Sequence, residues 1–268
     1  ILYLIRDTVG VKPLYYLKDT FTNKFFFSSS IRSLLLNLKQ KQMNKTIFNY
    51  YSNLGRNDNN ETIFKGIFKL MPGELLILNK NILDKKKFLN FKFLNKNSDN
   101  NSIKQLISTS IKNQLISDVP VSLSLSGGVD SNIVYSVMRQ NLDTKFNTYS
   151  FKFKDHEKFN EDFNVAKKNT EFYGNKFIPI EIEYNDFIEH NEKITEILEE
   201  PIANQCSILN YCMSKKITEK VLLTGDGGDE IFTGYDRYRS IYIIQLLQKF
   251  NIFKNLEIKT KFRNLNRF

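Results

Sequence analysis

Between residues 103 and 223, short apolar runs of strand length alternate with longer stretches that have helical spacing of apolar residues, and this alternation limits the fold more than any other feature. The expected strands are Val119–Leu125, Phe146–Phe153, Lys176–Ile182 and Val221–Leu223. The expected helices are Ile103–Ile116, Asn132–Gln140, Asp162–Tyr173 and Ser207–Thr218. Strands that alternate with helices predict an α/β fold with a parallel sheet and helices on both faces. In such sheets ligands bind beyond the carboxyl ends of the strands.

The first hundred residues have a different pattern, in which short apolar runs are joined by polar turns. We expect strands and one short helix there, at Leu2–Ile5, Leu14–Leu17, Phe25–Phe27, Glu74–Leu78 and, for the helix, Ile31–Leu38. Residues 84–101 are rich in Lys, Asn and Asp and predict a linker, so we place a domain boundary between residues 97 and 98. The expected domains are therefore residues 1–97 and 98–268. Ile1, in place of Met, opens a strand-like run, which indicates a piece of a longer protein.

Net charge and cysteine content argue against several classes of protein. The chain has 39 Lys and Arg against 29 Asp and Glu, a formal charge of +10, and the densest basic groups are Lys85–Lys87 and 251–268. Because the other basic residues are spread along the chain, a solvated surface is favoured over a nucleic-acid interface. The two Cys and two His lack zinc-ligand spacing and cannot form a disulfide framework. We therefore expect no zinc site, and we expect Cys206 and Cys212 to be buried core thiols in a reducing cytoplasm. No apolar run reaches the roughly 18 residues of a membrane span.

The segment Ser126-Gly127-Gly128-Val129-Asp130-Ser131 stands between an expected strand and an expected helix. Two adjacent glycines let backbone N–H groups approach an anion, and the start of the next helix adds unpaired donors and partial positive charge. Ser126 and Ser131 add hydroxyl donors, and the Asp130 carboxylate suits a Mg²⁺ ion that bridges phosphates. No Lys follows the glycines, so the segment is not the GxxxxGK[ST] loop. It predicts a pyrophosphate-binding loop, in preference to a plain Gly-Gly turn with a helix cap.

A second segment, Thr224-Gly225-Asp226-Gly227-Gly228-Asp229-Glu230, directly follows the expected strand Val221–Leu223. Its three glycines and three acids would make a poor structural element, because glycine has high backbone entropy and like charges repel at short range. The pattern suits a site in which a divalent cation and a positively charged intermediate lie over the carboxylates. An exposed acidic turn is the alternative interpretation.

The third segment, Arg6–Tyr16, reads RDTVGVKPLYY and by itself indicates only a turn between two strands. Together, Arg6–Tyr16, Ser126–Ser131 and Thr224–Tyr235 resemble, in order and spacing, the signatures of glutamine-hydrolysing asparagine synthetase and its amidotransferase relatives. Residues 62–73 resemble the connecting segment of that family. The resemblance implies a synthetase domain with the parallel-sheet ATP-pyrophosphatase fold, of the adenine nucleotide alpha hydrolase type. It also implies that the C-terminal part of an α+β glutaminase domain, of the N-terminal-nucleophile type, precedes this domain.

The resemblance also implies an activity. The carboxylate of aspartate attacks the α-phosphate of ATP, and ammonia from glutamine converts the acyl-adenylate into asparagine, with release of AMP and pyrophosphate. ATP is then expected at Leu125, Ser126, Gly127, Gly128, Asp130, Ser131, Phe151, Thr224 and Gly225. Mg²⁺ is expected at Asp130 and Asp229, and Asp226 is expected to take a proton as ammonia attacks. The implied partners are these small molecules, with no nucleic acid or membrane, and a homodimer stays open.

The acceptor is the part of this interpretation with the most alternatives. Position 226 is Asp, where the best-known asparagine synthetases have Glu, and Glu200–Gln205 only loosely resembles the family's acceptor segment. Both features keep open an amidotransferase that acts on another carboxylate, such as a sugar acid of a surface polysaccharide. Argininosuccinate, NAD and GMP synthetases share the pyrophosphate loop, but Arg6–Tyr16 argues against them. The family's glutaminase Cys and catalytic Lys cannot be assigned to any residue of this sequence.

Overall fold

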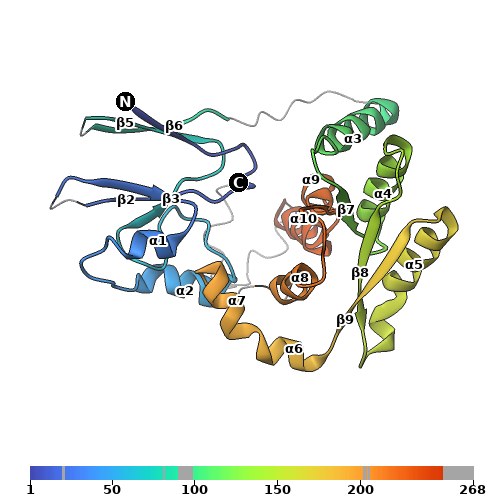
Figure 1. Ribbon diagram of the computed structural model, residues 1–268. Coiled ribbons are helices and arrows are strands. Elements are labelled where there is room, and N and C mark those ends of the chain that lie inside the picture. The colour runs from blue at the N-terminus through green and yellow to red at the C-terminus, as the bar shows by residue number, and fades with distance from the viewer. Residues whose placement is uncertain (20–21, 81, 90–98, 202–203, 205, 250–268) are drawn as a thin grey trace. The chain divides into compact units, whose positions relative to one another are not determined.

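The computed structural model describes residues 1–19, 22–80, 82–89, 99–201, 204 and 206–249 (Figure 1). The described residues form two compact units that interleave along the chain. The first unit contains those in 1–104, 151–157 and 180–217, and the second contains those in 105–150, 158–179 and from 218 onward. The predicted boundary between residues 97 and 98, part of Glu200–Gln205 and the basic segment 251–268 lie outside the described residues.

The first unit holds two three-stranded antiparallel sheets, with the orders β1-β5-β6 and β3-β2-β4. Their strands are β1 (Leu2–Ile5), β2 (Tyr15–Lys18), β3 (Phe25–Ser28), β4 (Ile67–Lys69), β5 (Glu74–Asn79) and β6 (Ile82–Lys87). The Tyr16 ring is buried and stacks on Phe25 and on Phe68, with ring centroids 5.9 and 5.5 Å apart. The strands predicted in this region are confirmed, and β4 and β6 are additional.

Strand β6 corrects the start of the expected linker. Residues 84–87 pair with β5, and every β6 side chain is exposed. The Lys85 ammonium lies 3.4 Å from the Glu74 carboxylate on β5. A run of lysines therefore suits this exposed edge strand, where charge discourages pairing with another sheet.

Hydrogen bonds from Arg6 and to Asp7 fix the turn of the Arg6–Tyr16 segment. The Arg6 guanidinium donates to the backbone oxygens of Gly10, Lys12 and Leu70 at 2.7–3.0 Å. The Asp7 carboxylate accepts from the backbone N–H groups of Val11 and Lys12. Arg6 and Asp7 therefore stabilise this turn through hydrogen bonds to its backbone.

The helices of the first unit come from distant parts of the sequence. They are α1 (Ile31–Leu35), α2 (Lys45–Leu54), α6 (Tyr184–Glu189), α7 (Asn191–Leu198) and α8 (Cys206–Ser214). The N-terminus of α1 is held by Glu199, the residue after α7, whose carboxylate accepts from the Ser30 hydroxyl at 2.5 Å and from the Ile31 N–H. On α8, Cys212 is buried as predicted, but Cys206 is exposed because it occupies the first turn of the helix.

The second unit is built on a four-stranded sheet of order β10-β7-β8-β9. The strands are β7 (Val121–Ser124), β8 (Asn147–Phe153), β9 (Lys176–Ile182) and β10 (Val221–Leu223), and the last residues of β8 and β9 belong to the first unit. β7 runs parallel to both β10 and β8. The helices are α3 (Asn100–Gln114), α4 (Val129–Asn141), α5 (Glu161–Tyr173), α9 (Gly228–Phe232) and α10 (Asp236–Lys249), with a 3₁₀ turn at Glu157–Asn160.

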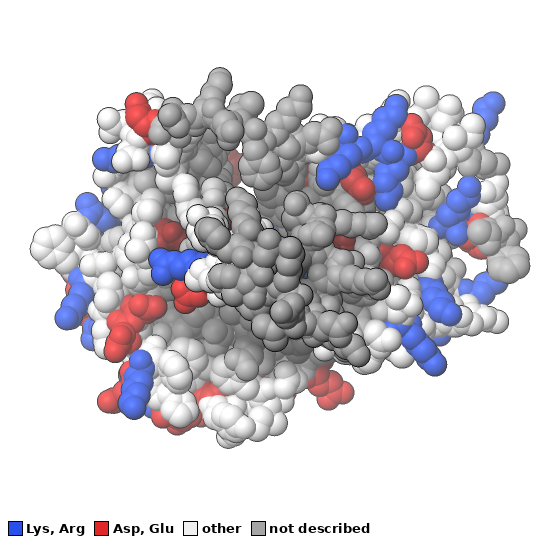
Figure 2. All heavy atoms as spheres, turned by 180° about the vertical axis from the view of Figure 1, so that it is seen from behind, with Lys and Arg blue, Asp and Glu red and all other residues white. Residues whose placement is uncertain are grey.

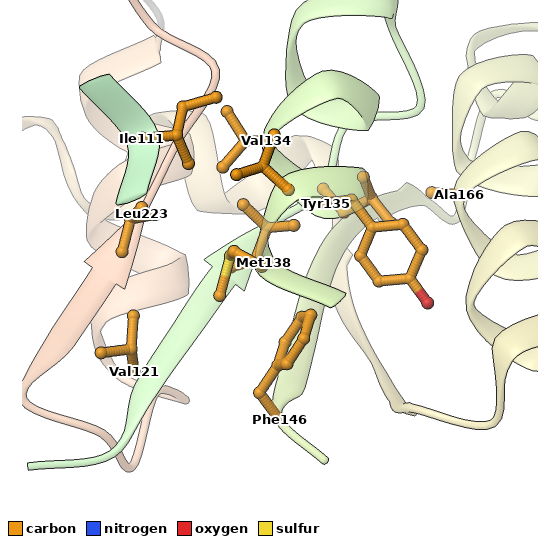
Figure 3. Close-up of a cluster of buried hydrophobic side chains, with 11 residues drawn as sticks. Ile111, Val121, Val134, Tyr135, Met138, Phe146, Ala166 and Leu223 are labelled. Carbon is orange, nitrogen blue, oxygen red and sulfur yellow. The ribbon is translucent and has the colours of Figure 1, made fainter. Parts of the chain in front are cut away.

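One hydrophobic core joins α3, α4 and α5 to this sheet (Figure 3). Met138 of α4 and Leu123 of β7 are fully buried, and Leu223 of β10 packs into the same cluster. The rings of Tyr135 and Phe146 meet edge to face at 5.8 Å. This packing fixes α4 against the sheet, and so it fixes the loop that joins β7 to α4.

Within the part of the chain that the structure describes, no helix combines the length and apolar character that crossing a bilayer requires. Among the described residues seen in Figure 2, basic side chains stand among acidic ones.

Candidate functional site

Two loops meet at the carboxyl ends of β7 and β10, where the sequence predicts the site. Leu123 pairs with Leu223 in the parallel register, so residues 126–131 and 224–230 leave the sheet at the same edge. A Cβ atom placed on Gly228 would lie 2.4 Å from the Asp130 carboxyl carbon, and one on Gly225 would lie 2.7 Å from the Ser131 nitrogen. The two predicted motifs are therefore in van der Waals contact within the second unit.

A network of hydroxyl hydrogen bonds shapes the first loop. The Ser126 and Ser131 hydroxyl oxygens are 2.9 Å apart, and Ser131 donates to the Gly128 carbonyl at 3.1 Å. Ser131 Oγ accepts from the Gly127 N–H, and Ser126 Oγ accepts from the Gly128 N–H, both at 3.3 Å. The hydroxyls predicted as phosphate donors thus also form hydrogen bonds within the loop and help to hold its shape.

Gly127 has a backbone that only glycine adopts without strain. Its φ is +100°, and a Cβ there would lie 2.0 Å from the carbonyl oxygen of Asp162 at the start of α5. The requirement for glycine is therefore both conformational and steric. It brings the loop backbone directly against a neighbouring element of the same unit.

The start of α4 supplies the expected anion-binding end of a helix. The helix begins at Val129, three residues before the predicted start, so Asp130 and Ser131 lie in its first turn. Gly128 is the N-cap residue and offers no side chain to the first-turn N–H groups. Backbone donors at an uncapped helix start, together with the helix dipole, favour a phosphate.

Asn132 contributes to the loop and was not singled out from the sequence. Its side-chain amide donates to the carbonyls of Gly127 at 2.7 Å and Gly128 at 2.9 Å. Asn169 of α5 donates in turn to the Asn132 side-chain oxygen at 2.8 Å. Asn132 follows the motif directly, but an Asn in a first helical turn is common, so its role depends on the three-dimensional structure.

Carboxylates from the two loops act on one another electrostatically. Partial burial and the negative charges of Asp229 and Glu230 raise the pKa of the Asp130 carboxyl above its ordinary value. Carboxylate oxygens are ligands that Mg²⁺ prefers, and a cation bound by Asp130 and Asp229 would offset their repulsion. Asp130 and Asp229 thus fit the predicted metal, although their role as ligands stays a prediction.

The remaining predicted residues have the following environments. The Asp226 side chain is exposed, and Thr224 Oγ1 donates to its carboxylate at 2.9 Å. Leu125 has its side chain fully buried in the core, so only its backbone faces the loop, and its N–H donates to the Tyr149 carbonyl at 2.8 Å. Phe151 is half-buried on β8. The functions predicted for these residues stay predictions.

Comparison with known proteins identifies the family. The model of the asparagine synthase family matches residues 102–267, and that of a glutamine amidotransferase domain matches residues 1–89. The chain belongs to the asparagine synthase family. Its fold class is therefore the predicted α/β class, a parallel-sheet synthetase domain that follows part of a glutaminase domain.

Several curated proteins are similar to almost the whole chain. A Methanocaldococcus jannaschii protein, provisionally named as asparagine synthetase [glutamine-hydrolyzing] 2, is 30% identical over 93% of this chain and 50% of its own length. Asparagine synthetase [glutamine-hydrolyzing] 3 of Bacillus subtilis is 29% identical over 88% of this chain and 41% of its own length. Amidase chyE of Penicillium rubens is 24% identical, over 90% and 38%. The chain thus spans half or less of the length of these relatives.

Solved structures resemble the chain more distantly. The U34-tRNA thiolase NcsA from Methanococcus maripaludis aligns with 47% of this chain and 46% of its own at 16% identity and a TM-score of 0.35. The NH3-dependent NAD synthetase from Campylobacter jejuni aligns with 43% and 48% at 17% identity and a TM-score of 0.29. These scores are too low to add to the family assignment.

Proposed function

We propose that this chain carries the ATP site and the amide-forming residues of a glutamine-dependent ligase that makes asparagine from aspartate. The observation that carries the proposal is the meeting of the Ser126–Ser131 loop and the Thr224–Asp229 loop at the carboxyl ends of two parallel strands. One loop offers donors for a phosphate and the other offers carboxylates, which is the pair of functions that activation of a carboxylate by ATP requires.

The proposed reaction has two steps. In the first, an oxygen of the aspartate side-chain carboxylate attacks the α-phosphorus of ATP, and the bond to the β-phosphate oxygen breaks to release pyrophosphate. In the second, the electron pair of ammonia attacks the acyl carbon, and AMP leaves with the carboxylate oxygen. Activation is needed because a free carboxylate is a poor electrophile.

The loop residues have distinct roles in this scheme. The hydroxyls of Ser126 and Ser131 and the backbone N–H groups at the start of α4 would bind the pyrophosphate portion. Asp130 and Asp229 would hold Mg²⁺, whose charge would offset that of the departing pyrophosphate. The exposed carboxylate of Asp226 would take the proton that ammonia loses as it bonds to carbon. Leu125, Phe151, Thr224 and Gly225 would border the adenosine.

A second candidate is the same chemistry on a different carboxylate, such as a sugar acid of a surface polysaccharide. The Asp at position 226 and the similarity to amidase chyE both favour it over a strict assignment of aspartate. Both candidates share the substrates ATP and glutamine and a cytoplasmic setting. They differ only in the acceptor.

The test uses the full-length product of the gene with Mg-ATP, glutamine and a series of carboxylates that includes aspartate. AMP, pyrophosphate and the amide are measured together. The proposal predicts all three in equal amounts with aspartate. If pyrophosphate forms only with another carboxylate, the acceptor is wrong but the ATP chemistry stands, and if ADP forms, the adenylation scheme is wrong.

Variants connect this reaction to the residues. Asp226→Asn should lower the rate of amide formation about 100-fold or more, the lower end of the range for loss of a general base, and affect adenylation less. Asp236→Asn is the control, because Asp236 is an exposed carboxylate a short distance further along the chain and outside the two loops. If the two variants form the amide at the same rate, Asp226 is not the general base.

A further inference from the structure

Three side chains outside the candidate ATP site bring an oxygen, a nitrogen and a sulfur atom together in the first unit. Asp186 lies on α6, His190 directly follows that helix, and Cys212 lies on α8. Their ligand atoms all lie within 4.8 Å of one another. The spacing of Cys and His along the sequence did not indicate this group. Cys212 is more than twenty residues from Asp186 and His190 in the sequence, and the fold brings them together.

The separation of Asp186 and His190 is compatible with two ligands of one ion. Asp186 Oδ1 lies 3.5 Å from His190 Nε2. This distance is longer than a normal N–H···O hydrogen bond of about 2.7–3.2 Å. Two ligands about 2.0–2.1 Å from a tetrahedral Zn²⁺ ion would be roughly 3.3 Å apart. The two atoms therefore need to move little to share a metal.

Neighbouring groups hold these ligands in place. The second oxygen of Asp186 accepts from the Glu183 N–H at 2.7 Å in a capping box at the start of α6. That bond leaves Oδ1 free to face His190, four residues further along the chain and directly after α6. The His190 ring meets the Tyr211 ring edge to face at 5.1 Å, and Cys212, the next residue on α8, is 8% exposed. Support of this kind orients metal ligands in known sites.

We propose that Asp186, His190 and Cys212 bind a divalent ion of the Zn²⁺ class, with a fourth position for water. A thiolate, an imidazole and a carboxylate together suit borderline-soft ions, whereas Mg²⁺ takes oxygen ligands. This site is therefore chemically distinct from the carboxylates at the carboxyl ends of β7 and β10. A bound ion would connect α6 to α8.

The test is a Co²⁺ titration of the full-length gene product, without ATP. A Co²⁺–thiolate bond gives a charge-transfer band in the near ultraviolet, which oxygen ligands alone do not give. We expect this band to saturate at one equivalent and to disappear when Zn²⁺ is added. The Cys212→Ser variant should lose the band. The control Cys206→Ser should retain it, because Cys206 is the exposed thiol of the same helix.

Two further variants keep the test decisive if Cys212→Ser does not fold. The side chains of Asp186 and His190 are 27% and 20% exposed, so Asp186→Asn and His190→Gln should fold. Each should weaken Co²⁺ binding at least about tenfold, as expected when a ligand is lost. The proposal is overturned if the unsubstituted protein gives no thiolate band, if both of these variants retain full affinity, or if Cys206→Ser alone loses the band. None of these outcomes depends on the proposed ligase activity.

Discussion

Two glycines with nearly the same φ angle allow the effect of packing on the phosphate loop to be measured. Gly127 has φ +100° and Gly227 has φ +97°. A Cβ at Gly127 would lie 2.0 Å from the Asp162 carbonyl oxygen, whereas a Cβ at Gly227 would meet no described atom within 4 Å. Gly127→Ala therefore adds conformational strain and a steric clash, and Gly227→Ala adds only the strain.

The expected costs follow from this difference. A left-handed backbone costs an L-residue about 1–2 kcal/mol relative to glycine, and this term applies to both variants. Overpacking costs about 1–3 kcal/mol more, and it applies to Gly127→Ala alone. We expect Gly227→Ala to destabilise the second unit by about 1–2 kcal/mol and Gly127→Ala by about 2–5 kcal/mol.

Native-state hydrogen exchange of the β7 amides measures this free energy within the second unit, even if the whole chain does not unfold in one step. Calorimetric titration with Mg-ATP adds the effect on the loop, and we expect a larger loss of affinity for Gly127→Ala. Equal destabilisation by the two substitutions would contradict the close approach of the loop to Asp162. A greater loss for Gly227→Ala would contradict it more strongly.

Three further predictions concern single side chains. Because burial and nearby carboxylates raise the pKa of Asp130, the stability that this group contributes is present at low pH and lost as pH rises through its folded-state pKa. Asp130→Asn should therefore raise the melting temperature at neutral pH without Mg²⁺, and it should remove the stabilisation that Mg-ATP gives. A lower melting temperature without Mg²⁺ would show that the Asp130 carboxylate stabilises the fold and would refute this prediction. Asn132→Ala removes two hydrogen bonds to the loop and should weaken ATP binding about tenfold by calorimetry. Asn169→Ala should have a smaller effect, because Asn169 donates a hydrogen bond to Asn132 rather than to the loop carbonyls. Glu199→Ala removes the acceptor that holds the start of α1 and should lower the urea unfolding free energy by about 1–3 kcal/mol, whereas the exposed Glu196→Ala should change it by less than about 0.5 kcal/mol.

The sheet could be predicted because its strands are short apolar runs between turn residues. The predicted bounds of β9 and β10 agree with the structure, and those of β7 and β8 differ from it by two residues or fewer at each end. Helices α2, α6, α7, α9 and α10 were not predicted. The start of α6 has a capping box formed by Glu183 and Asp186. Glu-x-x-Asp lacks the usual Ser/Thr-x-x-Glu/Gln pattern, so the sequence offered little signal for this helix.

The site could be predicted only where its functional residues are adjacent in the sequence. The Ser126–Ser131 and Thr224–Glu230 segments each show their glycines and acids locally, so both loops could be named from the sequence. Their mutual contact follows from the parallel pairing of β7 with β10, which the strand order does not reveal in advance. Asn132 was missed because its function is a hydrogen bond to the loop, and the Asp186, His190 and Cys212 group was missed because packing of α6 near α8 creates it.

The most direct test of the account follows one oxygen atom through the reaction. The full-length gene product is incubated with Mg-ATP, glutamine and aspartate that is labelled with oxygen-18 in its side-chain carboxylate. The masses of the products are then measured by mass spectrometry. If the two loops activate the carboxylate as an acyl-adenylate, AMP carries one labelled oxygen and pyrophosphate carries none. Label in inorganic phosphate, or AMP without label in the presence of newly made asparagine, would contradict the adenylation chemistry proposed for the Ser126–Ser131 and Thr224–Asp229 loops.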